Sequence, residues 1–443
     1  MLTLVCDKKL GKEQIHMRDT IIKLFNLEPS ELEDVEVTHT DYSVFIFVTL
    51  KRKFQRCPDC GCSTKVIHDY RERTLAHPII NDAFTTIVFK QRRYRCINCD
   101  KIFPEANPFA FPNKRVSKFV VLRVMKMLKN PRVTFTMAAK EIGISTSSVI
   151  RIFDKYAGIT PISLPVCLGI DEVYAIKYKQ KIFACVLVDL NSNQIYDLLP
   201  SRKKAELCAY FSRIPREERC KVKYVCMDMY QLYKDVAEVY FPEAKICVDS
   251  FHVVKLICNA CDNVRIRIMK QFDTSSEEYQ LLKNFNWLLR KSYQNVKKSE
   301  YINLKKYYYL FDSQYVMPDT LINMMISFNV ELELAYSLKE EYLYWNKRVD
   351  ESNAERFVAH MAEEFASYGI RELSSVAKTL RNWQSEIVNS FNHHKGRRIS
   401  NGPVESVNSR IKVVKRNGNG YSNFERFRKR VIYSLNEDSS IKI

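Results

Sequence analysis

The sequence contains no stretch approaching the roughly 20 consecutive apolar residues that a transmembrane helix needs. It also lacks a secretory start, because charged residues follow Cys6 directly and no small-residue cleavage site is present. We therefore expect a cytoplasmic protein with no membrane partner. In a reducing compartment, its 14 cysteines are expected to be metal ligands or small core residues rather than disulfides.

Acidic residues are under-represented, with 51 Asp and Glu against 70 Lys and Arg, a net charge of +19 and a pI near 9.2. This excess favours a polyanionic partner, and nucleic acid is the first candidate. A generally lysine-rich composition is the alternative explanation. The basic residues nevertheless cluster, at Lys51, Arg52, Lys53, Arg56, Arg92, Arg93 and Arg95 beside cysteines and at Lys412, Lys415, Arg416, Arg426, Arg428, Lys429 and Arg430 near the C-terminus.

Glycine and proline are nearly absent from residues 251–390, where Gly369 and Pro318 stand alone. This absence predicts an overwhelmingly helical stretch. Before it, residues 167–248 alternate in the order strand, strand, strand, helix, strand, helix, strand, which predicts an α/β sheet with helices on its faces. Nearer the N-terminus we expect a helix from Met17 to Leu27 and a strand from Tyr42 to Leu50.

Two Cys-x-x-Cys pairs, separated by 35 residues, predict a structural zinc site formed by Cys57, Cys60, Cys96 and Cys99. Each pair supplies two thiolates from one tight turn, and together they complete a tetrahedral set. Cys62, His68 and His77 are alternative ligands in or beside the spacer. A redox-active pair is a further alternative, although that chemistry needs a single pair.

Residues 135–153 carry a helix-turn-helix pattern, with Gly143 at the turn and Ala139 where two helices must touch. Ser145 is a plausible N-cap of the second helix. The residues then expected on the DNA-contacting face are Thr146, Ser147, Ser148 and Arg151. An ordinary helical hairpin is the alternative.

Three carboxylates occur in contexts suited to metal-dependent phosphoryl transfer. Asp171 and Asp228 each end an apolar run, and Glu405 follows Pro403 at an expected helix start. Two divalent ions held by such acids activate a nucleophile and stabilise a leaving oxygen. Magnesium accepts oxygen ligands from several elements while keeping waters, so three acids suffice.

Neighbouring acids offer alternatives to this trio. Glu172 is adjacent to Asp171, but alternation along a strand points it to the opposite face. Asp189 is better explained as a turn former. Asp249 is either an N-cap or an auxiliary site residue, and His252 on the next turn faces either the site or the core.

Together these motifs resemble the insertion-sequence transposases of the ISL3 type. The resemblance rests on the cysteine pairs, the helix-turn-helix, Gly169-Ile-Asp-Glu, Met227-Asp-Met and above all Ser400-Asn-Gly-Pro-Val-Glu-Ser-Val-Asn-Ser-Arg-Ile-Lys. It implies a multidomain α/β protein in which an RNase H-like catalytic domain, with an all-α insertion, is preceded by a zinc finger and a helix-turn-helix. The implied catalytic triad is Asp171, Asp228 and Glu405.

The resemblance further implies cleavage and strand transfer of DNA ends with Mg²⁺ or Mn²⁺, and structural Zn²⁺. The expected partners are double-stranded DNA, as terminal inverted repeats and as target, and a second copy of the chain, with nucleoid association when DNA is bound. Beyond Glu405, phosphates are expected to contact Lys412, Lys415 and Arg416. A non-catalytic DNA-binding regulator and a nuclease without strand transfer are the alternatives.

The sequence thus predicts six segments. Residues 1–53 have no assigned role; the others are 54–103 (zinc binding), 113–160 (helix-turn-helix), 165–260 (catalytic core, first part), 261–392 (all-helical insertion) and 393–443 (catalytic core, final part with a basic tail).

Overall fold

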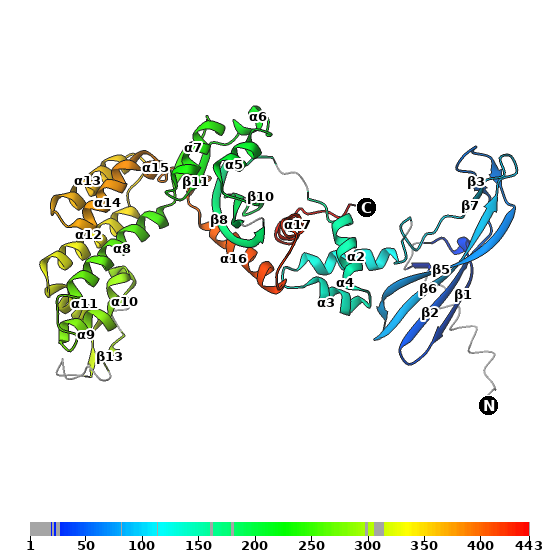
Figure 1. Ribbon diagram of the computed structural model, residues 1–443, viewed down its shortest axis with the longest axis horizontal. Coiled ribbons are helices and arrows are strands. Elements are labelled where there is room, and N and C mark those ends of the chain that lie inside the picture. The colour runs from blue at the N-terminus through cyan, green and yellow to red at the C-terminus, as the bar shows by residue number, and fades with distance from the viewer. Residues whose placement is uncertain are drawn as a thin grey trace. The chain divides into compact units, whose positions relative to one another are not determined.

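The computed structural model describes residues 19, 22–23, 27–80, 82–112, 114–159, 163–178, 181–296, 300–304 and 314–442 (Figure 1). It consists of two compact units, Met1–Thr160 with Val413–Ile443, and Pro161–Lys412. The helix expected from Met17 to Leu27 lies largely outside the described residues. Among the described helices, none is both long and apolar enough to cross a membrane.

The first unit opens with a mixed sheet whose order is β1-β2-β6-β5, with β7 pairing to β6. Its strands are β1 (Leu32–His39), β2 (Ser43–Leu50), β5 (Ile67–Ile80), β6 (Ala83–Arg95) and β7 (Ile102–Pro104). A short turn η1 (Pro29–Glu31) precedes it, and the small pair β3 (Gln55–Arg56) and β4 (Ser63–Thr64) lies beside the first cysteines. The expected strand from Tyr42 to Leu50 is confirmed.

This sheet joins residues that the sequence analysis had assigned to separate segments. β2 pairs in parallel with β6 along Ser43–Val48, and residues from both strands share one apolar core that includes Val48 and Phe89. The predicted zinc-binding segment, residues 54–103, is thus part of a larger sheet. The reason is that the long hairpin β5–β6 extends well beyond the cysteines and needs β1 and β2 to cover it.

The arginines beside the cysteines are neutralised within this unit. Arg92 is buried and lies 2.6 Å from Glu33 and 3.5 Å from Glu105, whereas Arg93 pairs with Asp69. Arg95 likewise pairs with Asp100 at 2.7 Å. Their clustering in the sequence therefore serves the fold, and they add less to a nucleic-acid surface than the charge count indicates.

Three helices follow: α2 (Lys118–Lys129), α3 (Phe135–Ile142) and α4 (Thr146–Tyr156). Thr134 caps α3, and Ser145 caps α4 by accepting from the Ser148 amide at 3.2 Å, as expected. Gly143 ends α3 with φ of 80°, in the left-handed region that favours glycine. Its missing side chain also matters, since a Cβ there would lie 2.8 Å from the Phe84 ring.

The C-terminal helix α17 (Phe424–Leu435) belongs to this helix cluster and not to the catalytic core, which corrects the expected segment 393–443. Tyr433 of α17 shares the core of α2, α3 and α4. Arg430 is 1% exposed and donates to the carbonyls of Leu128, Asn130 and Val133, closing the C-terminal end of α2. Basic residues of this tail are thus used in packing.

The second unit contains a sheet of order β10-β9-β8-β11-β12. Its strands are β8 (Cys167–Tyr178), β9 (Lys181–Asp189), β10 (Ile195–Leu199), β11 (Tyr224–Met227) and β12 (Lys245–Val248), connected in part by α5 (Lys204–Phe211), α6 (Arg216–Arg219) and α7 (Gln231–Tyr240). The first three strands are antiparallel, and β8, β11 and β12 are parallel. The predicted order of strands and helices is confirmed.

A large helical region follows β12, built around one apolar core. It consists of α8 (Ser250–Met269), α9 (Glu277–Asn284), α10 (Asn286–Arg290), η2 (Tyr293–Asn295), α11 (Pro318–Ser327), α12 (Val330–Asn346), α13 (Ala354–Ser367), α14 (Arg371–Asn382) and α15 (Gln384–Asn389). The expected boundary at residue 261 is wrong, because α8 runs through it without a break. Nor is the region wholly helical, since β13 (Ile302–Asn303) pairs with β14 (Tyr315–Val316).

The chain then forms a hairpin of β15 (His393–His394) and β16 (Arg397–Arg398) before entering α16 (Gly402–Asn417). α16 carries Glu405 in its first turn, as expected.

We predict that Arg430→Ala destabilises the first unit by on the order of 3 kcal/mol, since it leaves three carbonyls and a cavity in the helix cluster. Thermal unfolding followed by circular dichroism measures this. Lys126→Ala, an exposed change on α2, should alter stability by less than about 0.5 kcal/mol; equal effects of the two changes would contradict a bracing role for Arg430.

Candidate functional site

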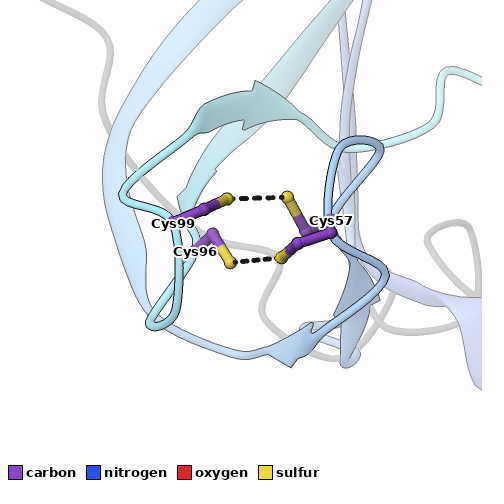
Figure 2. A group of neighbouring side chains, drawn as sticks. Cys57, Cys96 and Cys99 are labelled. Atoms are coloured by element: carbon purple, nitrogen blue, oxygen red, sulfur yellow. Dashed lines mark hydrogen bonds between the residues drawn. The ribbon is translucent and has the colours of Figure 1, made fainter.

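The four cysteines expected to bind zinc come together at one end of the first unit's sheet. Their sulfur atoms all lie within 4.8 Å of one another, with 3.5 Å between Cys57 and Cys99 and 3.4 Å between Cys60 and Cys96 (Figure 2). Zn–S bonds of about 2.3 Å in a tetrahedron separate sulfurs by roughly 3.8 Å. None of the described cysteines forms a disulfide. The geometry therefore fits one structural Zn²⁺.

The alternative ligands do not belong to this cluster. His77 is buried elsewhere, with its Nδ1 3.0 Å from the Ser117 hydroxyl, and His68 lies beside Asp69. Cys62 is not a member of the four-sulfur group. The predicted ligand set is the one that the fold assembles.

In the second unit, strand register aligns three aspartates across the sheet. Cys226 of β11 is opposite Gly169 of β8, and Met227 is opposite Val248 of β12. Advancing along these parallel strands, Asp228 comes level with Asp171 on one side and with Asp249 on the other. Adjacent strands are about 4.8 Å apart, so the three carboxylates form a short row on one face of the sheet.

His252 joins two members of this row. Its Nε2 lies 3.7 Å from Asp228 and its Nδ1 lies 3.5 Å from Asp249. Asp249 occupies the N-cap position of α8 but makes no capping hydrogen bond. Its Oδ1 instead accepts from the backbone amide of Asn401 at 3.1 Å. Of the two readings the sequence left open, His252 thus faces the acids rather than the core.

The start of α16 is fastened to the same face by two asparagines. Asn401 donates to the carbonyl of Ile170 at 3.2 Å, and Asn408 donates to Oδ2 of Asp171 at 2.8 Å. Gly169 permits this approach, because a Cβ there would lie 2.5 Å from both Leu190 and Val404. Sequence reasoning missed both asparagines as site residues. The sequence did contain a signal: Asn408 is a polar residue at helical spacing among the apolar Val404, Val407 and Ile411.

Glu405 lies between these two anchors on α16. At 100° per residue, its side chain lies about 60° of arc from Asn408. It is exposed. Within the described residues, the cysteines are the only group whose ligand atoms already have the spacing of a three-ligand metal site. The structure thus places Glu405 three residues before Asn408, the residue that donates to Asp171.

The neighbouring acids behave as alternation and turn chemistry predict. Glu172 faces the other side of the sheet, where it pairs with Arg202 and accepts from the Tyr233 hydroxyl at 3.4 Å. Asp189 accepts from the Asn191 amide at 2.9 Å and from the Ser192 hydroxyl at 2.7 Å. Both have structural roles.

Burial shapes the electrostatics of the row. It raises the pKa of Asp171 to about 6, with the nearby Asp228 adding to the effect, and it raises the pKa of Asp228 as well. The pKa of His252 is raised chiefly by its interaction with Asp249. Buried oxygens of Asp228, Asp249, Asn401 and Asn408 have no hydrogen-bond partner. The site therefore holds more buried acceptors than its own donors satisfy.

The residues expected to contact DNA are distributed around α4 and along α16. Ser147 and Arg151 are exposed, and Thr146 and Ser148 are half-buried. Arg151 donates to the Ser147 carbonyl and the Ser148 hydroxyl, both at 3.3 Å. On α16, Lys412 and Arg416 are exposed and Lys415 is half-buried, where burial lowers its pKa.

We predict about one zinc per purified chain and a loss of zinc in Cys96→Ser, because a tetrahedral site does not tolerate removal of one thiolate. Elemental analysis of the purified proteins measures the zinc content of wild type and variant. Cys62→Ser is the matched control and should retain zinc; unchanged zinc in Cys96→Ser would refute the ligand set.

We also predict a pH-dependent effect of Asp171→Asn in magnesium-free buffer. A carboxyl whose pKa rises on folding contributes stability below its ordinary value near 3.8, and that contribution is lost as the pH rises through about 6. As the pH rises from 4 to 8, the free energy of unfolding of the variant should therefore increase relative to that of wild type, by on the order of 1–3 kcal/mol. Thermal unfolding at each pH measures this difference. A difference that stays constant with pH would contradict a raised pKa.

Comparison with known proteins agrees with this arrangement. A transposase family model of the ISL3 type matches residues 168–431, more than half of the chain. A second model, the zinc-finger of transposase IS204/IS1001/IS1096/IS1165, matches residues 53–99 and so contains all four cysteines.

Curated relatives point the same way. The transposase for insertion sequence element IS1001 of Bordetella parapertussis is 24% identical over 390 residues, covering 86% of this chain and 89% of the relative. The transposase for insertion sequence element IS1557 of Mycobacterium tuberculosis is 30% identical over 100 residues, or 23% of this chain and 22% of the relative. With a zinc ribbon followed by a matching transposase domain, the chain belongs to the ISL3 family of DDE transposases and is a DNA transposase.

Proposed function

We propose that Asp171, Asp228 and Glu405 form the catalytic triad with which this transposase cleaves DNA ends and transfers them to a target. The observation that carries the proposal is that Asp228, directly after β11, is level with Asp171 on the adjacent parallel strand β8, and that α16, which is bonded to Asp171, carries Glu405 in its first turn. An acid from each of three elements around one point is the arrangement that two-metal phosphoryl transfer requires.

The residues fit a pair of Mg²⁺ or Mn²⁺ ions. Burial raises the pKa of both aspartates, and an unpartnered oxygen remains on Asp228, so a cation would relieve costs that the protein alone does not offset. Asp171 and Asp228 would hold ions directly, and Glu405 would complete the set. When bound, such ions supply an activated water or DNA hydroxyl and a stabilised leaving oxygen.

The surrounding groups position these acids. Asn408 fixes one oxygen of Asp171, and the Glu172 amide donates to the other at 2.7 Å. His252 balances charge between Asp228 and Asp249, while Asp249 holds the Asn401 amide and so the start of α16. We assign Asp249 and His252 positioning roles, because each acts through a neighbouring group.

We further propose that the sheet of the second unit is the RNase H-like core and that α3 and α4 form a helix-turn-helix that binds the terminal repeats. The antiparallel first three strands and parallel last two support the former. The exposed Ser147 and Arg151 on a capped helix support the latter. Lys412, Lys415 and Arg416 would neutralise phosphates, and joining two ends implies a dimer.

The test uses labelled duplexes carrying the inverted repeats that flank the coding sequence. Asp171→Asn, Asp228→Asn and Glu405→Gln should each keep end binding but lose cleavage and strand joining by about 10³-fold, equivalent to several kcal/mol of transition-state stabilisation. Cleaved and joined products are resolved on denaturing gels with Mg²⁺ or Mn²⁺.

Asp189→Asn is the matched control, since it changes an acid at a neighbouring strand end while keeping a side-chain oxygen for the turn. It should alter the rate less than tenfold. Wild-type rates in any triad variant would remove that residue from the mechanism, and cleavage without joined products would indicate a nuclease.

A further inference from the structure

A surface cavity of about 500 Å³ lies in the second unit where the hairpin β15–β16 meets the start of β8 and the residues that lead into α16. Its lining includes Lys395, Arg397 and Arg398 and contains no acidic side chain. Such a lining selects for an anion. Neither the proposed triad nor the helix-turn-helix uses these residues.

The hairpin holds its charged tip rigidly. His394 pairs with Arg397, and the two residues between them, Lys395 and Gly396, have φ of 49° and 74°. Both angles are positive, as a two-residue type I′ turn requires, and asparagine or glycine fits such positions better than lysine does. Lys395 is therefore a charged residue at a turn position whose backbone conformation favours asparagine or glycine.

Arg398 anchors the hairpin and leaves the other cations available. It donates to the Ser390 carbonyl at 3.0 Å and to the Asn346 carbonyl at 2.6 Å, and it stacks on Phe391 at 3.7 Å. Lys395 and Arg397, by contrast, are exposed, and within the described part of the chain their side chains form no hydrogen bond or ion pair. The hairpin thus has one fixed arginine and two cations free to bind.

A buried group without a partner also borders this cavity. Nε2 of His394 is inaccessible to solvent yet makes no hydrogen bond, while the ring packs against Tyr224 at 6.2 Å. Because this nitrogen is inaccessible to solvent, a ligand in the cavity does not reach it in this conformation. The two exposed cations, Lys395 and Arg397, are the groups that suit a phosphate.

The cavity is close to the aspartate row along β8. Cys167 lines it, and Asp171 lies four residues further, or about 13 Å at roughly 3.3 Å per residue. Ser400 also lines it and precedes Asn401, the residue bonded to Asp249. A span of this length covers only a few nucleotides of one DNA strand.

From this geometry we propose that the cavity binds a backbone phosphate of the DNA strand, a few nucleotides from the phosphodiester held at the aspartates. Lys395 and Arg397 supply both the charge and the hydrogen-bond donors. The position, though not the anion site itself, rests on the proposed triad. A strand held here would keep its register while the bond beside Asp171 reacts.

The test measures how tightly the full-length protein binds a labelled terminal-repeat duplex at NaCl concentrations from about 50 to about 300 mM. Lys395→Gln with Arg397→Gln should reduce the slope of log affinity against log salt by about 1, the loss of one phosphate contact. Lys270→Gln with Lys378→Gln removes the same charge from exposed helical positions and should leave the slope unchanged. Lys395→Arg with Arg397→Lys should also preserve it.

A set of duplexes, each with one neutral methylphosphonate at a different position of the strand, then locates the contact. Substitution at one phosphate a few nucleotides from the cleaved bond should weaken wild-type binding but leave the Gln variant unaffected, because the partners are already lost. Equal slopes in the two Gln variants, or equal sensitivity to every methylphosphonate in wild type and variant, would overturn the phosphate site. Failure of the triad would instead appear as cleavage by Asp171→Asn, with these slopes unchanged.

Discussion

Gathering carboxylates on one partly buried face of a sheet is electrostatically unfavourable, and much of the second unit is arranged around that constraint. Parallel pairing of β8, β11 and β12 aligns Asp171, within β8, with Asp228 and Asp249, which directly follow β11 and β12. The protein offsets part of the repulsion with the imidazole of His252, the backbone amides of Glu172 and Asn401, and the side-chain amide of Asn408. The remaining imbalance leaves buried oxygens of Asp228 and Asp249 without a hydrogen-bond donor.

The same constraint explains why α16 is attached by asparagines. A carboxylate at the position of Asn408 would add a fourth acid to the row, and a lysine would neutralise Asp171 and compete with a metal. The amide of Asn408 orients Asp171 without changing the net charge of the site. Gly169 makes the contact sterically feasible. Neutral side chains therefore position the acids, and the acids keep their charge.

Local patterns predicted much of this arrangement. Alternation separated Asp171 from Glu172, and spacing identified the four cysteines, because these relations span a few residues or a single pair of turns. Long-range relations were not legible. The sequence gives no indication that β2 pairs with β6, that Arg430 closes α2 across some 300 residues, or that Asn408 meets Asp171. Each depends on packing between elements whose local sequence is compatible with several partners. Triad roles, magnesium and dimerisation stay predictions.

The position of α17 bears on how the protein is made. The helix cluster of the first unit draws its core from α2, α3 and α4 and from α17, which is translated only after the whole of the second unit. Domains generally fold in order from the N-terminus during synthesis. Here the nascent chain exposes the apolar surface that Tyr433 and Arg430 later cover until its last residues emerge. Premature termination products therefore lack a complete helix cluster.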